Sequence, residues 1–143
     1  MINSYSSFWR VDPAALPSGN HRRRIDGGPL IDLPVLQAFL SSQEFDLDSL
    51  WVATDRCEQD LVNYRWTYED VVQMLGCLKA NDFNTSEWCQ VKGGSVVPCD
   101  VYVMSFDEIR RQRSTSGFEV YMKFSIDTAG AITLVLVSCH APR

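Results

Sequence analysis

The chain has 143 residues, of which 45% are hydrophobic and 22% are charged, and these proportions fit one globular domain that can bury a core without metals or disulfides. No run approaches the roughly 20 apolar residues of a membrane span, and no basic segment followed by an apolar one opens the chain as in a secretory signal. The net charge of −5 argues against a general nucleic-acid binder. Because the sequence shows neither a membrane span nor a secretory signal, we expect a cytoplasmic protein with no membrane partner.

The first 30 residues are rich in proline and glycine and show little periodicity. We therefore predict an irregular arm over residues 1–30, of which Phe8 and Trp9 pack on the domain, and a single domain over residues 31–143. Asp32 can cap a helix that has Pro34 in its first turn and ends near Ser41.

Two further helices follow a short apolar run, Leu50 to Ala53, that fits an edge strand. Thr54 or Asp55 can cap the first of them. Thr67 and Asp70 have nearly the spacing of a capping box at the start of the second. The apolar positions of these two helices recur at helical spacing: Cys57, Leu61 and Tyr64, then Val71, Met74, Leu75 and Leu78.

After Phe83 the pattern becomes alternating, which predicts strands at 88–91, 101–106 and 118–126, a turn at 127–130, and a last strand at 132–138. The last run is almost continuously apolar, as in a strand covered on both faces. The fold class that follows is α+β, with about three N-terminal helices packed on one face of an antiparallel β-sheet.

Three residues in the last two strands carry candidate chemistry. Tyr121 and Lys123 share the face opposite the apolar one, where they can bind an anion, and His140 can transfer protons near neutral pH. An ordinary solvated strand face and an exposed terminal histidine explain the same pattern.

The loop before the third strand contains Arg110, Arg111 and Arg113, which fit either a loop that holds phosphates or a solubilising turn. The cluster from Arg22 to Arg24 has the same two explanations. Five cysteines in no paired pattern fit buried thiols; a cysteine nucleophile would need His21 or His140 as its base. No metal-ligand spacing or cofactor motif occurs, so we expect neither a metal nor a cofactor.

Several short segments, in order, resemble the MqsR family of bacterial toxins over about three-quarters of the chain. They are Asn81-Asp82-Phe83, Asp100-Val101-Tyr102, the segment from Gly117 to Lys123, and the ending Val137-Ser138-Cys139-His140. The third segment matches a G-x-V-Y-x-K strand of the family but has one additional residue between the glycine and the valine.

The resemblance implies a RelE-like fold and a metal-independent endoribonuclease, an mRNA interferase of a type II toxin–antitoxin system that inhibits translation and growth. It implies catalytic roles for Tyr121, Lys123 and His140, and RNA contacts by Tyr102 together with the three arginines of the loop. The implied partners are messenger RNA and a cognate antitoxin, with operator DNA bound only through the antitoxin.

The chain also departs from the family pattern. Thr85 stands where a lysine is expected, Cys99 where a glutamine is expected, and His140 replaces a lysine. These differences, with the acidic charge, leave a second hypothesis open: a RelE-like domain that has lost catalysis and acts by binding proteins. An enzyme of the same fold acting on another substrate is a third.

Overall fold

The computed structural model describes residues 7–17 and 23–142. The helices are α1 (Leu33–Leu40), α2 (Asp55–Tyr64) and α3 (Tyr68–Cys77), with 3₁₀ turns at Pro13–Ala15, Leu47–Ser49 and Ala80–Asp82. The strands are β1 (Arg24–Ile25), β2 (Leu50–Val52), β3 (Phe83–Gln90), β4 (Val96–Asp107), β5 (Gln112–Arg113), β6 (Phe118–Asp127) and β7 (Thr133–His140). The predicted α+β class is confirmed.

The strands form one mixed sheet in the order β1-β3-β4-β6-β7-β2, with β5 paired to β4. All neighbours are antiparallel except β2, which runs parallel to β7 with Leu50 opposite Leu134. The prediction of an antiparallel sheet is therefore wrong at this edge. Parallel strands need a long connection, and here that connection contains α2, α3 and the whole run of strands from β3 to β6.

Each helix begins at a cap that the sequence predicts. Asp32 and Thr54 each accept a hydrogen bond of 3.1 Å from the backbone N–H three residues further on, at the starts of α1 and α2. Thr67 and Asp70 form a complete capping box on α3, with bonds of 2.8 and 3.1 Å. These bonds satisfy amides that have no partner inside the helix, so they fix where each helix starts.

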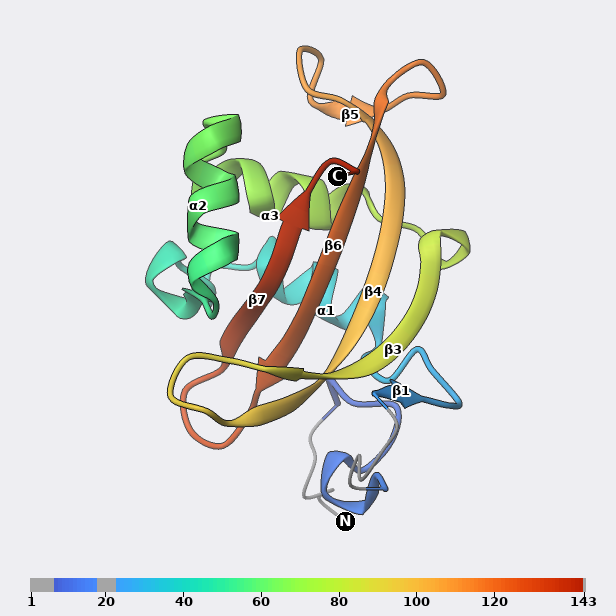
Figure 1. Cartoon of the computed structure of the whole chain (residues 1–143), viewed down its shortest axis with the longest axis vertical. Helices are drawn as coiled ribbons and strands as arrows, with labels where there is room; N and C mark the ends of the chain where they lie inside the picture. The colour runs from blue at the N-terminus through green and yellow to red at the C-terminus, as the bar shows by residue number, and fades with distance from the viewer. Residues whose placement is uncertain (1–6, 18–22, 143) are drawn as a thin grey trace.

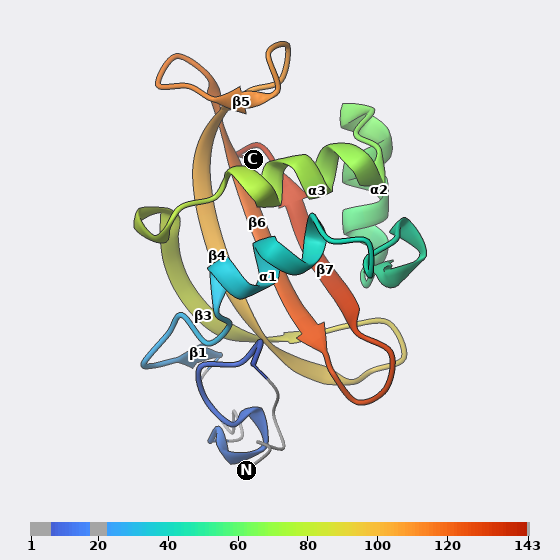
Figure 2. The same cartoon turned by 180° about the vertical axis from the view of Figure 1, so that it is seen from behind.

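The helices α1 and α3 cover one face of the sheet, and α2 lies beside β7 at its edge (Figures 1 and 2). The main core forms between these helices and the covered face of the strands. Its fully buried side chains include Leu36, Leu75, Met104, Met122, Phe124 and Leu136. Because alternate residues of β6 enter this core, Tyr121 and Lys123 point to the other side of the sheet. None of the described helices is long and apolar enough to cross a bilayer.

The hairpin between β3 and β4 curves over the lower part of the other face (Figure 1). At its tip Lys92 donates its backbone N–H to the carbonyl of Ala53 at 2.8 Å, and its ammonium to the carbonyl of Val52 at 3.2 Å. A second apolar cluster lies beneath, consisting of Ala53, Cys89, Val91, Cys99, Val135 and Val137. The prediction that the last strand is covered on both faces is confirmed here.

The described part of the arm is folded onto the domain. Trp9 is buried and pairs with Ile31 in an isolated β-bridge. The prediction that Trp9 packs on the domain is therefore confirmed. Ile25 is also buried and pairs with Ser86 as β1 extends the sheet beside β3. This two-residue strand was not predicted, because two residues carry no readable alternation.

A buried carboxylate joins the arm to the sheet. Asp100 of β4 is fully buried and accepts hydrogen bonds from the backbone N–H groups of Leu30 (3.0 Å) and Ile31 (2.9 Å) and from the Ser86 hydroxyl (2.6 Å). Burial raises the pKa of Asp100, and these hydrogen bonds oppose the rise. The first residue of the Asp100-Val101-Tyr102 segment therefore has a structural role.

The element boundaries differ most from prediction around the hairpin. β3 begins at Phe83 instead of residue 88, and β4 at Val96 instead of residue 101. The additional residues pair with one another across the hairpin, as where Trp88 lies opposite Pro98. Pairing across strands thus outweighs the low strand preference of proline and of the polar residues 84–87. α3 ends at Cys77, before the predicted end at residues 81–82.

Candidate functional site

The strands β6 and β7 bring the three predicted catalytic residues together. Tyr121 lies opposite His140, and Lys123 lies opposite Ser138, on the face that points away from the helices. The rings of Tyr121 and His140 are stacked, with centroids 5.7 Å apart and planes 17° apart. We refer to Tyr121, Lys123, Ser138 and His140 as the β6–β7 patch.

The half-buried His140 ring is held by its own chain end. Its Nδ1 lies 2.6 Å from the carbonyl oxygen of Ala141. Since a carbonyl only accepts, Nδ1 carries the proton in this bond, which leaves the lone pair of the neutral ring on Nε2. Nε2 makes no hydrogen bond to the residues that the structure describes. It is therefore the atom at which His140 can take up or release a proton.

Lys123 is half-buried and has a carboxylate partner. Its Nζ lies 2.6 Å from Oε1 of Glu87 on β3, and Oε2 of Glu87 lies 3.1 Å from Nε of Arg23. One negative charge is thus shared by two positive charges, so this part of the face keeps a net positive charge. A phosphate that binds to Lys123 has to compete with Glu87.

Glu87 was missed in the sequence. The strand that contains it was predicted to begin at residue 88, so its side chain was given no direction. With β3 beginning at Phe83, alternation places Thr85, Glu87 and Cys89 on one face. The polar residues before Trp88 could have indicated a longer strand with a polar face. Their pairing with β4, which shows that they form a strand, is visible only in the structure.

Of the three positions that depart from the family pattern, His140 belongs to this patch, and Thr85 and Cys99 border it. Thr85 lies opposite Val101, which in turn lies opposite Lys123. Cys99 lies opposite Glu87 and is fully buried next to Cys89. The hydrogen bond between the two thiols is the main cause that lowers the pKa of Cys89. All five cysteines are free and four are buried, as expected of structural thiols.

The arginine loop is turned toward the helical layer. Nη1 of Arg111 lies 2.6 Å from Asp70 of α3, and Arg113 makes a two-fold ion pair with Asp82. Arg110 remains exposed. The structure thus does not bring Arg111 and Arg113 together with the β6–β7 patch. Of the other basic cluster, Arg22 lies outside the described residues, as does the alternative base His21.

Tyr102 requires a correction. It was predicted to contact RNA, but only 1% of its surface is exposed and it lies on the helix-facing side of β4. Its ring stacks on Phe124 at 5.7 Å and meets Phe83 edge-on at 5.6 Å. Alternation along β4 places Val101 and Val103, but not Tyr102, on the face of the β6–β7 patch.

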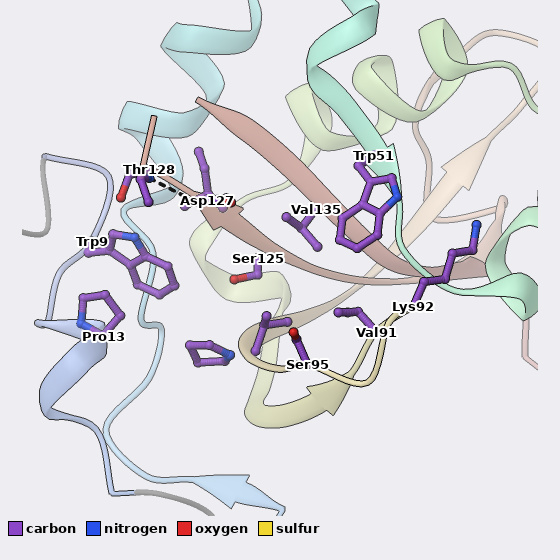
Figure 3. A pocket seen from close by; sticks show the side chains of 14 residues that line it. Trp9, Pro13, Trp51, Val91, Lys92, Ser95, Ser125, Asp127, Thr128 and Val135 are labelled. Atoms are coloured by element: carbon purple, nitrogen blue, oxygen red, sulfur yellow. Dashed lines mark hydrogen bonds between the residues drawn. The ribbon is translucent and has the colours of Figure 1, made fainter. Parts of the chain in front are cut away.

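A cavity of about 430 Å³ lies on the same side of the sheet as the patch. Figure 3 shows the side chains that line it. Ser125, which lies two residues beyond Lys123 on β6, is part of its lining, with Val135 and the hairpin residue Val91. Trp51 also lines it and is 39% exposed, which makes its indole available for stacking. Among the described residues of the lining, Lys92 is the one cation, and it lies 2.5 Å from Glu58.

Within residues 7–17 and 23–142, no group of three or more histidine, cysteine, aspartate or glutamate side chains could hold a metal ion. Comparison of the chain with models of known protein families, with curated proteins and with solved structures gives no match.

Proposed function

We propose that the chain is a metal-independent endoribonuclease with a RelE-like fold, the messenger-RNA-cleaving toxin of a bacterial toxin–antitoxin pair. The observation that supports it most is the β6–β7 patch itself. Two strands place a phenol, an imidazole and an ammonium side by side on one face, with Tyr121 and His140 in ring contact. The sequence resemblance assigns catalytic roles to the same three side chains.

The patch can supply what cleavage by a ribose 2′-hydroxyl requires. Nε2 of His140 takes the proton of the 2′-hydroxyl as its oxygen attacks the adjacent phosphate. The Tyr121 hydroxyl donates to the departing 5′-oxygen, and the Lys123 ammonium stabilises the added negative charge on phosphorus. The products are a 2′,3′-cyclic phosphate and a free 5′-hydroxyl, and none of these steps uses a metal ion.

The cavity next to the patch fits single-stranded RNA. Strands rise about 3.3 Å per residue, so Ser125 lies roughly 7 Å along β6 from Lys123. A phosphate at Lys123 would place the next base toward this cavity, where the exposed indole of Trp51 is available for stacking. The negative net charge of the chain is compatible with this mode because few phosphates are contacted.

The proposal is tested with purified protein and a single-stranded RNA in the presence of EDTA. We expect cleavage that yields 2′,3′-cyclic phosphate and 5′-hydroxyl ends, and growth arrest when the chain is expressed from a repressed promoter. Cleavage that needs a divalent ion, or products with 5′-phosphate ends, would contradict the chemistry assigned to the patch.

Glu87 should weaken RNA binding in the wild-type protein. We expect Glu87→Gln to tighten the binding of a non-cleavable 2′-O-methyl RNA by about two- to fivefold at low salt, because the substitution removes a negative charge next to Lys123. Fluorescence anisotropy measures the dissociation constant. Glu44→Gln makes the same change of charge on the connection after α1 and should have little effect; equal tightening in both variants would mean that net charge alone is responsible.

A specific observation also supports the alternative, a RelE-like binding module without catalysis. Lys123, Arg111 and Arg113 are all engaged with carboxylates of the chain itself. This alternative predicts soluble, folded protein that neither cleaves RNA nor arrests growth. For the proposed toxin, a cognate antitoxin is the expected partner, with operator DNA reached through it, and the RNA substrate implies action in the cytoplasm.

A further inference from the structure

The helix-covered side of the sheet contains a cavity of about 420 Å³ beside the first turn of α1. Its walls are mostly apolar, and include Ile31, Leu33, Pro34 and Leu78. Tyr102 of β4 contributes to the same wall. Because Tyr102 faces away from the β6–β7 patch, this cavity is separate from the proposed ribonuclease site.

The Tyr102 hydroxyl has no hydrogen-bond partner among the residues that the structure describes, although 99% of the side chain is buried, as its relative exposure of 1% shows. Among the described residues, every side-chain nitrogen or oxygen that is fully enclosed has a hydrogen-bond partner. A hydroxyl without a partner is therefore not fully enclosed, and the Tyr102 hydroxyl must be reachable from the cavity that Tyr102 lines. In the free protein only solvent in the cavity can bond to this hydroxyl, so a polar group of a ligand can take the place of that solvent. Burial also raises the pKa of Tyr102, which keeps the hydroxyl protonated and able to donate.

Two cations, Arg10 and Lys79, line the same cavity. Neither makes an ion pair with the described residues, whereas most other described lysines and arginines do; Arg10 donates only to the carbonyl of Pro29, at 3.0 Å. The carboxylate in the lining, Asp32, is engaged as the cap of α1, accepting from Val35 at 3.1 Å. The lining therefore contains two positive charges and one negative charge, and its net charge is positive.

We propose that this cavity binds a small organic anion with an apolar body and a carboxylate or phosphate head. The apolar part lies against Leu33, Pro34 and Leu78. The head group accepts the hydrogen bond of the Tyr102 hydroxyl and lies between the positive charges of Arg10 and Lys79. Apolar walls with a few convergent polar groups are the usual composition of small-molecule sites.

The full chain can be titrated with benzoate, with phenyl phosphate and with neutral benzyl alcohol while the backbone amide shifts are followed by NMR. We expect saturable shifts for both anions at residues 31–33 and 79–80, and binding of benzyl alcohol at least about tenfold weaker, since it lacks the charge. The tighter of the two anions identifies the preferred head group. Equal binding of benzyl alcohol, or no saturable shift at millimolar concentrations of either anion, would overturn the proposal.

Two variants separate the proposed contacts. Tyr102→Phe keeps the ring stacking and should weaken both anions by about three- to tenfold without lowering the unfolding temperature. Arg10→Gln combined with Lys79→Gln should abolish the preference for anions over benzyl alcohol. Arg56→Gln combined with Arg65→Gln removes the same charge elsewhere, at two exposed positions, and should leave binding unchanged. Unaltered affinity in the Tyr102→Phe protein would show that the hydroxyl is not part of a binding site.

Discussion

Replacing His140 by alanine is expected to lower the rate of RNA cleavage by about 10²- to 10⁴-fold, the usual contribution of a side chain that transfers a proton in the transition state. The variant should fold, because His140 is half-buried at the end of β7 and its ring makes one hydrogen bond, to the neighbouring residue. Single-turnover cleavage of a labelled RNA gives the rate, and circular dichroism reports the fold.

Matched variants make this result specific to His140. Tyr121→Phe keeps a ring stacked on His140 and removes the hydroxyl, so we expect slower cleavage with unchanged RNA binding. Ser138→Ala changes a side chain on the same strand and face to which we assign no chemical role, and it should cleave normally. Full cleavage, or undiminished growth arrest, in the His140→Ala protein would remove His140 from the mechanism.

The local features of the fold could be predicted because they depend on neighbouring residues. The caps Asp32, Thr54 and Thr67 each act within three residues of chain, and the structure confirms all three helix starts. The alternation of β6 likewise fixed the direction of Tyr121 and Lys123. The direction of His140, in contrast, could not be predicted from alternation. Leu134 and Leu136 face the main core, and an unbroken pattern would turn His140 the same way. Instead, the pairing of β7 with β6 shifts between Leu136 and Ser138, and this irregularity places His140 opposite Tyr121.

The features that the sequence did not reveal depend on pairing between distant segments. The parallel contact of β2 with β7 joins residues more than 80 positions apart, and no local pattern specifies it. Glu87 lies beside Lys123 only because β3 is longer than its polar sequence suggested. The sequence likewise did not show that the arginines of the loop have carboxylate partners. Arg111 and Arg113 form ion pairs with acidic residues of the helical layer, which are distant in the sequence.

The segment Asp100-Val101-Tyr102 shows how one motif can serve two faces of a sheet. Val101 lies on the same face as Lys123, while Asp100 and Tyr102 face the helices and the arm. A motif identified by resemblance therefore cannot be assigned as a whole to an active site. The carboxylate of Asp100 and the hydroxyl of Tyr102 require their own explanations, one in stability and the other in ligand binding.

Asp100→Ala is expected to lower the free energy of unfolding by roughly 3–5 kcal/mol, a large fraction of the stability of a domain of this size. The reason is that the carboxylate satisfies three buried donors, the amides of Leu30 and Ile31 and the Ser86 hydroxyl. Alanine leaves all three without an acceptor in a part of the protein that is closed to solvent. Urea denaturation followed by tryptophan fluorescence measures the loss.

The same contacts define the control and the position of the damage. Asp100→Asn keeps one acceptor oxygen and should lose less stability than Asp100→Ala, whereas Asp26→Ala removes an exposed carboxylate, 3.8 Å from Arg24, and should change little. Hydrogen exchange should accelerate first at the amides of Leu30 and Ile31, because they lose their acceptor directly. A loss below about 1 kcal/mol for Asp100→Ala, or unchanged exchange at these two amides, would mean that the arm is held mainly by the apolar contacts of Trp9 and Ile25 and not by this carboxylate.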